Sequence, residues 1–179
     1  MWSKFDYRAV SLFSPNLERS RTIYHEFDRV GLTGVIPMWS APNPYERIAE
    51  SNVSRQRLCS GGNFSVTVKH QQMVRTAYDT GSEFGLFFED DIRFLKDTND
   101  LERIVRAIPD DADFCLFDWK LVNSFIPNNF PDMKRQAESG ACWVRFNAPI
   151  VQAGCYALRR PAMRTFLGFL EDPARGKGR

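Results

Sequence analysis

An apolar run that ends in three carboxylates is the feature that most constrains the fold of this chain. The run Phe84–Phe88 reads FGLFF, and Glu89, Asp90 and Asp91 follow it directly. An apolar run of this length is typical of a strand that is buried on both faces. The chain therefore leaves the core at a point where three negative charges gather, and these charges need a partner that neutralises them.

Patterns typical of strands and helices alternate along the sequence. Besides Phe84–Phe88, strands are predicted for four segments: Tyr7–Phe13, 33–42, 112–119 and 148–160. Helical spacing of apolar residues predicts helices at 17–32, 64–81, 99–111 and 160–173. We expect Gly31 to end the first helix, Asn99 or Asp100 to cap the third, and Pro161 to lie in the first turn of the last. Residues 120–144 are rich in Asn, Pro, Gly and Ser, which favours a long surface loop.

This alternation predicts an α/β fold with a mainly parallel central sheet flanked by helices. The chain has 179 residues, the size of one domain with a substantial core. We expect that domain to cover residues 1–170 and a basic, flexible tail to cover 171–179. In open sheets of this kind, ligands bind beyond the carboxyl ends of the strands, which is where the three carboxylates lie.

The overall charge and the cysteines limit the classes of partner. Lys and Arg number 24 and Asp and Glu 22, which gives a formal net charge of +2 and argues against non-specific binding of nucleic acid. The four cysteines form no CxxC pair. The sequence has no signal-peptide pattern and no apolar run of the roughly 20 residues that cross a bilayer. We therefore expect a cytoplasmic protein with reduced thiols and at most peripheral contact with a membrane.

A divalent cation is one way to neutralise the three carboxylates. Hard oxygen ligands suit Mg²⁺ or Mn²⁺ better than zinc, and such ions keep positions open for substrate phosphates. The alternative is structural, because Asp and Glu after a strand also act as helix caps or lie in solvated turns. The triplet alone does not decide between these interpretations.

The order of several motifs resembles glycosyltransferase family 25, the lipooligosaccharide galactosyltransferase type. The match runs from about Val10 to Leu170. It consists of the Arg-rich start of the first helix, a Gly followed by a His-bearing helix, the hydrophobic-Glu-Asp-Asp motif and a Gly-x-Tyr strand that leads into a helix: here Arg19 and Arg21, Gly62 and His70, residues 86–91, and residues 154–156.

The resemblance implies a GT-A-type, Rossmann-like domain that binds a nucleotide sugar. It also implies an inverting transfer from a UDP-sugar, often UDP-galactose, to a saccharide or glycolipid acceptor of the kind used in lipopolysaccharide biosynthesis. A divalent metal, Mn²⁺ or Mg²⁺, would assist by binding the acidic motif.

The site residues expected on this basis fall into two groups. Glu89 and Asp91 are predicted to hold the metal, and Asp90, Arg19 and Arg21 to contact the UDP-sugar. Leaving diphosphate carries concentrated negative charge, so a cation or an arginine has to face it. Each arginine has a structural alternative as a solvated helix residue.

An inverting displacement also needs a base that takes the proton of the acceptor hydroxyl. Asp118, near the end of the segment 112–119, is the first candidate and Asp113 the second, although Asp118 is also compatible with a solvated turn. His70 is expected either to bind donor or acceptor or to be a structural histidine.

Two other classes of function remain open at this point. A metal-dependent nucleotidyltransferase would also place carboxylates at strand ends, but the sequence contains no GxxxxGK[ST] phosphate loop. A non-catalytic protein that binds a nucleotide or a glycan could keep the same fold. Metal-dependent release of UDP from a UDP-sugar separates a transferase from a binding protein.

Overall fold

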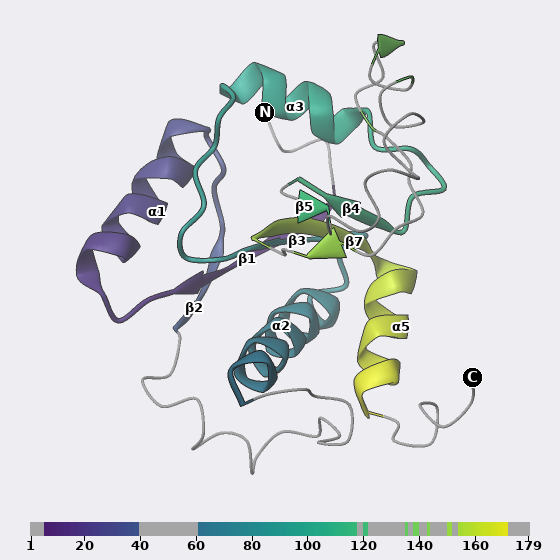
Figure 1. The fold of residues 1–179 in the computed structure, drawn as a ribbon. Helices are drawn as coiled ribbons and strands as arrows, with labels where there is room; N and C mark the ends of the chain where they lie inside the picture. The colour runs from purple at the N-terminus through teal and green to yellow at the C-terminus, as the bar shows by residue number, and fades with distance from the viewer. Residues whose placement is uncertain are drawn as a thin grey trace.

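The computed structural model describes residues 6–39, 61–117 and 154–171, together with the short pieces 120–121, 135, 138–139, 143 and 150–151. A central sheet separates two layers of helices (Figure 1). Helices α1 (Leu17–Arg29) and α3 (Thr98–Arg106) cover one face of the sheet, and α2 (Gly61–Asp79) and α5 (Arg160–Glu171) cover the other. The expected α/β class is confirmed for this part of the chain.

The sheet has five strands in the order β2 (Ile36–Trp39), β1 (Tyr7–Phe13), β3 (Phe84–Phe88), β7 (Cys155–Arg159) and β4 (Phe114–Leu116). Strand β1 is parallel to both β2 and β3, whereas β7 is antiparallel to both β3 and β4. The sheet is therefore mixed, and the expectation of a mainly parallel sheet is not confirmed. Apolar periodicity identifies a strand but carries no information about its direction. A second sheet consists of two short strands, β5 (Lys120–Leu121) and β6 (Ile150–Val151).

Most predicted elements lie where the sequence indicates. Strands β1 and β3 have the predicted bounds, Gly31 follows α1 with a φ of 67°, and Pro161 is the second residue of α5. The predicted cap of α3 is wrong. The cap is Asp97, whose carboxylate accepts a hydrogen bond of 2.9 Å from the backbone N–H of Asp100. Several polar residues precede this helix, and only the one whose oxygen reaches the amide three residues ahead acts as the cap.

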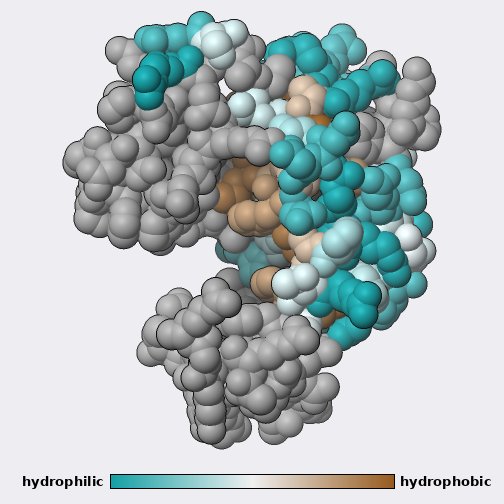
Figure 2. Space-filling model, turned by 90° about the vertical axis from the view of Figure 1, so that its right-hand side faces the viewer, coloured by the Kyte–Doolittle hydropathy of each residue, from teal (hydrophilic) through white to brown (hydrophobic). Residues whose placement is uncertain are grey.

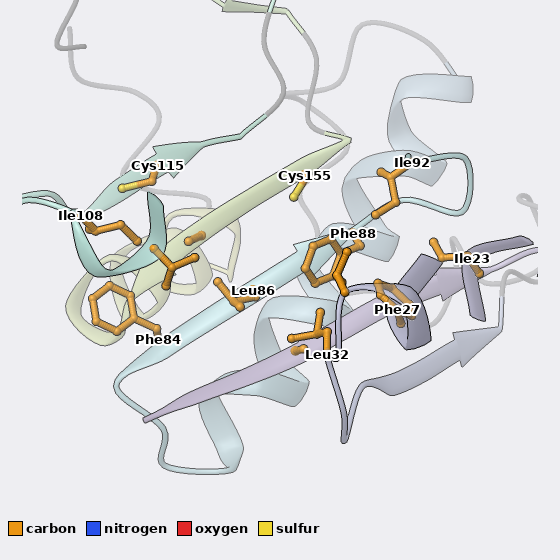
Figure 3. Close-up of a cluster of buried hydrophobic side chains, with 14 of the residues drawn as sticks. Ile23, Phe27, Leu32, Phe84, Leu86, Phe88, Ile92, Ile108, Cys115 and Cys155 are labelled. Carbon is orange, nitrogen blue, oxygen red and sulfur yellow. The ribbon is translucent and has the colours of Figure 1, made fainter. Parts of the chain in front are cut away.

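Side chains on the two faces of the sheet pack into two hydrophobic cores. On one face, Phe27 of α1 packs against Phe88 of β3 with ring centroids 5.3 Å apart, and the two lie close together in the cluster of Figure 3. On the other face, Phe87 packs with Met73 of α2 and Met163 of α5. A Cβ atom at Gly85 would overlap the Phe87 ring and approach the Met163 sulfur to 2.9 Å, which accounts for a glycine in this apolar run.

Hydrophobic residues also reach the surface. Figure 2 shows some of them in the middle of the side of the molecule that lies to the right in Figure 1, next to a hydrophilic surface. Phe114, on the edge strand β4, is an exposed large hydrophobic residue. None of the helices in the described ranges combines the length and the apolar character needed to cross a bilayer.

Candidate functional site

The candidate site lies beyond the carboxyl ends of the parallel strands β1 and β3. We call this end of the sheet the site edge. Ser11 of β1 pairs with Phe88, the last residue of β3, so the residues that follow both strands leave the sheet at the same edge. Glu89 is still held there, because its backbone N–H donates a 2.8 Å hydrogen bond to the carbonyl of Gly154. Asp90 and Asp91 then form a turn, and Ile92 returns to the core.

The turn after β1 fixes the start of α1. Asn16 caps the helix, and its side-chain oxygen accepts from the backbone N–H groups of Glu18 at 2.9 Å and Arg19 at 3.2 Å. The hydroxyl of Ser20 donates to the carbonyl of Ser14 at 2.7 Å. These bonds satisfy backbone groups that would otherwise lack partners at the end of a helix. They also determine where Arg19 leaves the helix.

Arg19 bridges two carboxylates of the acidic triplet. Its Nη2 atom lies 3.1 Å from Oδ1 of Asp90 and 3.1 Å from Oδ2 of Asp91. The side chains of Arg19, Asp90 and Asp91, which we call the Arg19 cluster, are 45%, 20% and 61% exposed. Ion pairs this accessible to water contribute only about 0–1 kcal/mol to stability. The cluster joins α1 to the end of β3, and Arg19 is the cation that neutralises two of the three charges.

A second contact holds the loop that follows the acidic triplet against α1. The carboxylate of Glu26 accepts from the backbone N–H of Phe94 at 2.8 Å and pairs with Nη2 of Arg29 at 2.9 Å. Arg29 also donates to the carbonyl of Phe94 at 2.6 Å. The hydrogen bond from Arg29 lowers the pKa of Glu26, against the opposing effect of burial, and the Phe94 amide lowers it further. This clamp, formed by Glu26, Arg29 and Phe94, holds the loop against α1, the helix that carries Arg19.

Glu89 contacts His70 and belongs to a hydrogen-bonded chain. Nε2 of His70 lies 3.1 Å from Oε1 of Glu89, and Nδ1 lies 2.8 Å from the hydroxyl of Tyr156. We call Tyr156, His70 and Glu89 the His70 chain. Its members come from β7, α2 and the end of β3, and Tyr156 and His70 are buried whereas Glu89 is partly exposed.

The surroundings of the His70 chain shift two pKa values in opposite directions. The hydrogen bond to His70 lowers the pKa of Glu89 despite partial burial of the carboxylate, and the charges of Lys69 and Arg19 act in the same sense. Burial raises the pKa of Tyr156 far above its ordinary value, and the negative charge of Glu89 adds to that effect. At neutral pH, Glu89 is therefore an ionised acceptor and Tyr156 keeps its proton.

Some of the predicted site residues lie together in the structure and others do not. Asp90, Asp91 and Arg19 come together, and His70 contacts Glu89. Arg21 does not join them: it is exposed, and two residues along a helix turn a side chain by about 200°. Asp118 lies outside the described residues. Its neighbour Phe117 is at the site edge of the sheet, because the Phe117 N–H donates to the carbonyl of Cys155 at 3.0 Å.

Asp113, the second candidate base, lies at the opposite edge of the sheet. It precedes Phe114, which pairs with Leu158, and Leu158 in turn pairs with Gly85 near the start of β3. Its carbonyl accepts from the N–H of Arg159 at 2.9 Å. The structure therefore does not bring Asp113 together with the carboxylates that follow β3.

The donors present fit part of a metal site. Oδ1 of Asp90 and Oδ2 of Asp91 face one cationic nitrogen at equal distances, which is the arrangement of two carboxylates around a cation. Among the residues that the structure describes, no group of three or more His, Cys, Asp and Glu side chains is placed to hold a metal ion. Glu89 is turned toward His70, so the pair that converges is Asp90 with Asp91.

Two contributors to the site had no role assigned from the sequence. Tyr156 belongs to the Gly-x-Tyr segment, but its contact with His70 joins residues 86 positions apart. Glu26 carried a usable signal, because a carboxylate between Ile23 and Val30 lies on the buried side of an amphipathic helix and needs a partner there. Both residues are polar groups on buried surfaces, and each has a partner from a distant segment: His70 for Tyr156 and the Phe94 N–H for Glu26.

Comparison with known proteins adds a structural similarity. No protein-family model matches this sequence, and no curated protein matches it. Among solved structures, the apo form of mouse xyloside xylosyltransferase 1 is similar, with a TM-score of 0.49 and 11% sequence identity; the match covers 94% of this chain and 72% of that chain. At this level of similarity, function has to be inferred from the side chains of the protein itself.

Proposed function

We propose that this protein is a glycosyltransferase that transfers a sugar from a UDP-sugar donor to a saccharide or glycolipid acceptor. The observation that carries the proposal is the Arg19 cluster. The guanidinium of Arg19, in the first turn of α1, meets two carboxylates that follow β3. They meet beyond the carboxyl ends of the strands, where α/β folds bind ligands. The order of motifs that resembles glycosyltransferase family 25 supports the same assignment.

The Arg19 cluster would bind the diphosphate of the donor. A guanidinium forms strong paired hydrogen bonds with phosphate oxygens, and Arg19 is exposed enough to exchange its carboxylate partners for them. Mg²⁺ commonly binds through one or two carboxylates together with substrate phosphates, a role that Asp90 and Asp91 suit better than the predicted pair of Glu89 and Asp91. A bound Mg²⁺ or Mn²⁺ ion would supply positive charge to the leaving diphosphate.

The transfer itself is an inverting displacement. An acceptor hydroxyl oxygen attacks the anomeric carbon, the bond from that carbon to the phosphate oxygen breaks, and the diphosphate leaves with the bonding electrons. The hydroxyl proton passes to a carboxylate at the site. Glu89 is ionised and partly exposed at this edge, and Asp118, the first candidate from the sequence, remains a candidate for the base.

The test of this function is release of UDP from a panel of UDP-sugars, with and without Mn²⁺. We expect metal-dependent release that Asp91→Ala abolishes. The matched control is Asp110→Ala, which removes an exposed aspartate that lies before β4 and away from the Arg19 cluster. Turnover that persists in Asp91→Ala would contradict the proposal. Binding of UDP without turnover by the wild-type protein would identify a non-catalytic nucleotide-binding protein instead.

A further inference from the structure

The His70 chain is a buried polar structure that the donor site does not require. His70 and Tyr156 are only 6% and 5% exposed. Removing polar groups from water costs free energy unless they are hydrogen-bonded, and both ring nitrogens of His70 have a partner. Such a chain fixes the geometry of its members, and its one partly exposed end is the carboxylate of Glu89.

The chemistry of the two ends sets the direction of the hydrogen bonds. The carboxylate oxygen of Glu89 is the acceptor in its 3.1 Å contact with Nε2 of His70, so Nε2 carries a proton and donates it. In a neutral imidazole, Nδ1 is then an acceptor, and the hydroxyl of Tyr156, which keeps its proton, is the donor. Tyr156 thereby selects the Nε2–H tautomer of His70.

Packing holds the Tyr156 end of the chain in place. Its ring lies between those of Phe87, with centroids 4.9 Å apart, and Phe114, at 5.9 Å. The position of the hydroxyl is therefore set by β3 and β4. Within the described residues, the second carboxylate oxygen of Glu89, Oε2, has no hydrogen-bond partner.

We propose that Tyr156 is a positioning residue that acts through His70 to hold one oxygen of Glu89, so that the other oxygen can hydrogen-bond the hydroxyl of an acceptor sugar. This role rests on the proposed glycosyltransferase function and extends it to the acceptor side of the site. Glu89 touches the substrate, whereas Tyr156 and His70 determine how its carboxylate is presented.

The tautomer of His70 gives a test that needs no substrate. The chain has two histidines, and His25 is exposed, so ¹⁵N spectra of the labelled full-length protein contain one buried and one exposed imidazole, assigned with His25→Gln. We expect His70 to be a single tautomer with the proton on Nε2, and Tyr156→Phe to move its Nδ1 resonance. A proton on Nδ1 in the wild-type protein would overturn the proposal, as would a His70 signal that Tyr156→Phe leaves unchanged.

Two further variants keep the test decisive. Glu89→Gln removes the charge at the other end and should move the Nε2 resonance even if Tyr156→Phe does not fold. Tyr78→Phe is the matched control, because Tyr78 lies near the end of α2, next to the turn that precedes β3, and packs under Arg160. It should leave both His70 resonances unchanged.

Kinetics separate positioning from a purely structural role. In the transfer reaction with a UDP-sugar and Mn²⁺, we expect Tyr156→Phe to lower kcat by about 10- to 100-fold, the effect typical of partners that orient a functional side chain, with the donor KM unchanged. An unchanged kcat would refute the positioning role. If the spectra show the predicted tautomer but the wild-type protein turns over no UDP-sugar, the glycosyltransferase proposal fails instead, and the acceptor role falls with it.

Discussion

The Arg19 cluster and the His70 chain divide the three adjacent carboxylates between them, and they differ in exposure and in type of interaction. In the Arg19 cluster, charges pair at the surface and each side chain remains in contact with water. In the His70 chain, two buried side chains are linked by directional hydrogen bonds to one partly exposed carboxylate. An exposed ion pair is weak and can exchange its partners for a ligand, whereas a buried chain is costly to disrupt and keeps one geometry. Binding is therefore expected from the first region and positioning from the second.

The largest effect should come from breaking the middle of the His70 chain. His70→Ala removes both hydrogen bonds and leaves the buried Tyr156 hydroxyl without its partner. It also creates a cavity. We expect a loss of about 3 kcal/mol in the free energy of unfolding. Denaturant unfolding, monitored by tryptophan fluorescence, measures this loss. A change below about 0.5 kcal/mol, typical of a surface substitution, would show that the chain is not a structural unit.

Tyr156→Phe should have the next largest effect on stability. The ring and its packing against Phe87 remain, and only the hydroxyl that donates to Nδ1 of His70 is lost. An unsatisfied buried acceptor costs roughly 1–3 kcal/mol. A double-mutant cycle with Glu89→Gln measures whether the two ends of the chain are coupled; additive effects would contradict a continuous chain.

The clamp between α1 and the loop after the acidic triplet should make stability depend on pH. Hydrogen bonding lowers the pKa of Glu26 in the folded protein below its ordinary value of 4.5. Its stabilising contribution is therefore fully present above that value and is lost as the pH falls through the folded pKa. We expect Glu26→Gln to cost about 1 kcal/mol at pH 7 and to flatten the fall in stability in acid.

Unfolding curves of the wild-type protein and Glu26→Gln between pH 7 and acid test this prediction. The exposed carboxylate variant Asp79→Asn, at the end of α2, is the matched control and should keep the pH dependence of the wild-type protein. A difference between Glu26→Gln and the wild-type protein that grows as the pH falls would contradict the sign derived from the Glu26 pKa.

The smallest effect on stability is expected in the Arg19 cluster. Arg19→Gln should change the free energy of unfolding by about 0–1 kcal/mol, because the pairs with Asp90 and Asp91 are exposed. The same substitution should weaken binding of UDP and Mn²⁺ strongly, measured by titration calorimetry. The matched change Arg21→Gln, on another side of α1, should affect neither quantity.

The local structure of the site was predictable from the sequence to a useful extent. The buried strand Phe84–Phe88 and its three carboxylates were placed correctly because an apolar run and its polar end are local signals. Arg19 could be paired with that end because β1 and β3 both lead to the same edge. Helical periodicity could also have shown that Arg21 does not face the carboxylates that Arg19 contacts, because Arg21 lies about 200° around the helix from Arg19.

The remainder depends on contacts between distant segments. The reversed direction of β7 brings Tyr156 to the level of Phe87 and next to His70, and no periodicity encodes that direction. The separation of Glu89 from Asp90 and Asp91 likewise follows from two partners on different helices, His70 on α2 and Arg19 on α1. Three adjacent carboxylates in a sequence thus become two regions with different chemistry only when the helices are in place.

The central claim is that the Arg19 cluster binds the diphosphate of a nucleotide sugar together with a divalent cation. Its most direct test is the thermal unfolding midpoint of the purified protein with Mn²⁺ and UDP, GDP or CMP, each alone and combined, because a ligand that binds only the folded state raises the midpoint. The predicted result is a rise with Mn²⁺ and UDP together that is absent in Asp91→Ala and retained in Asp110→Ala. A midpoint that no nucleotide changes, or a rise that persists in Asp91→Ala, would contradict the claim.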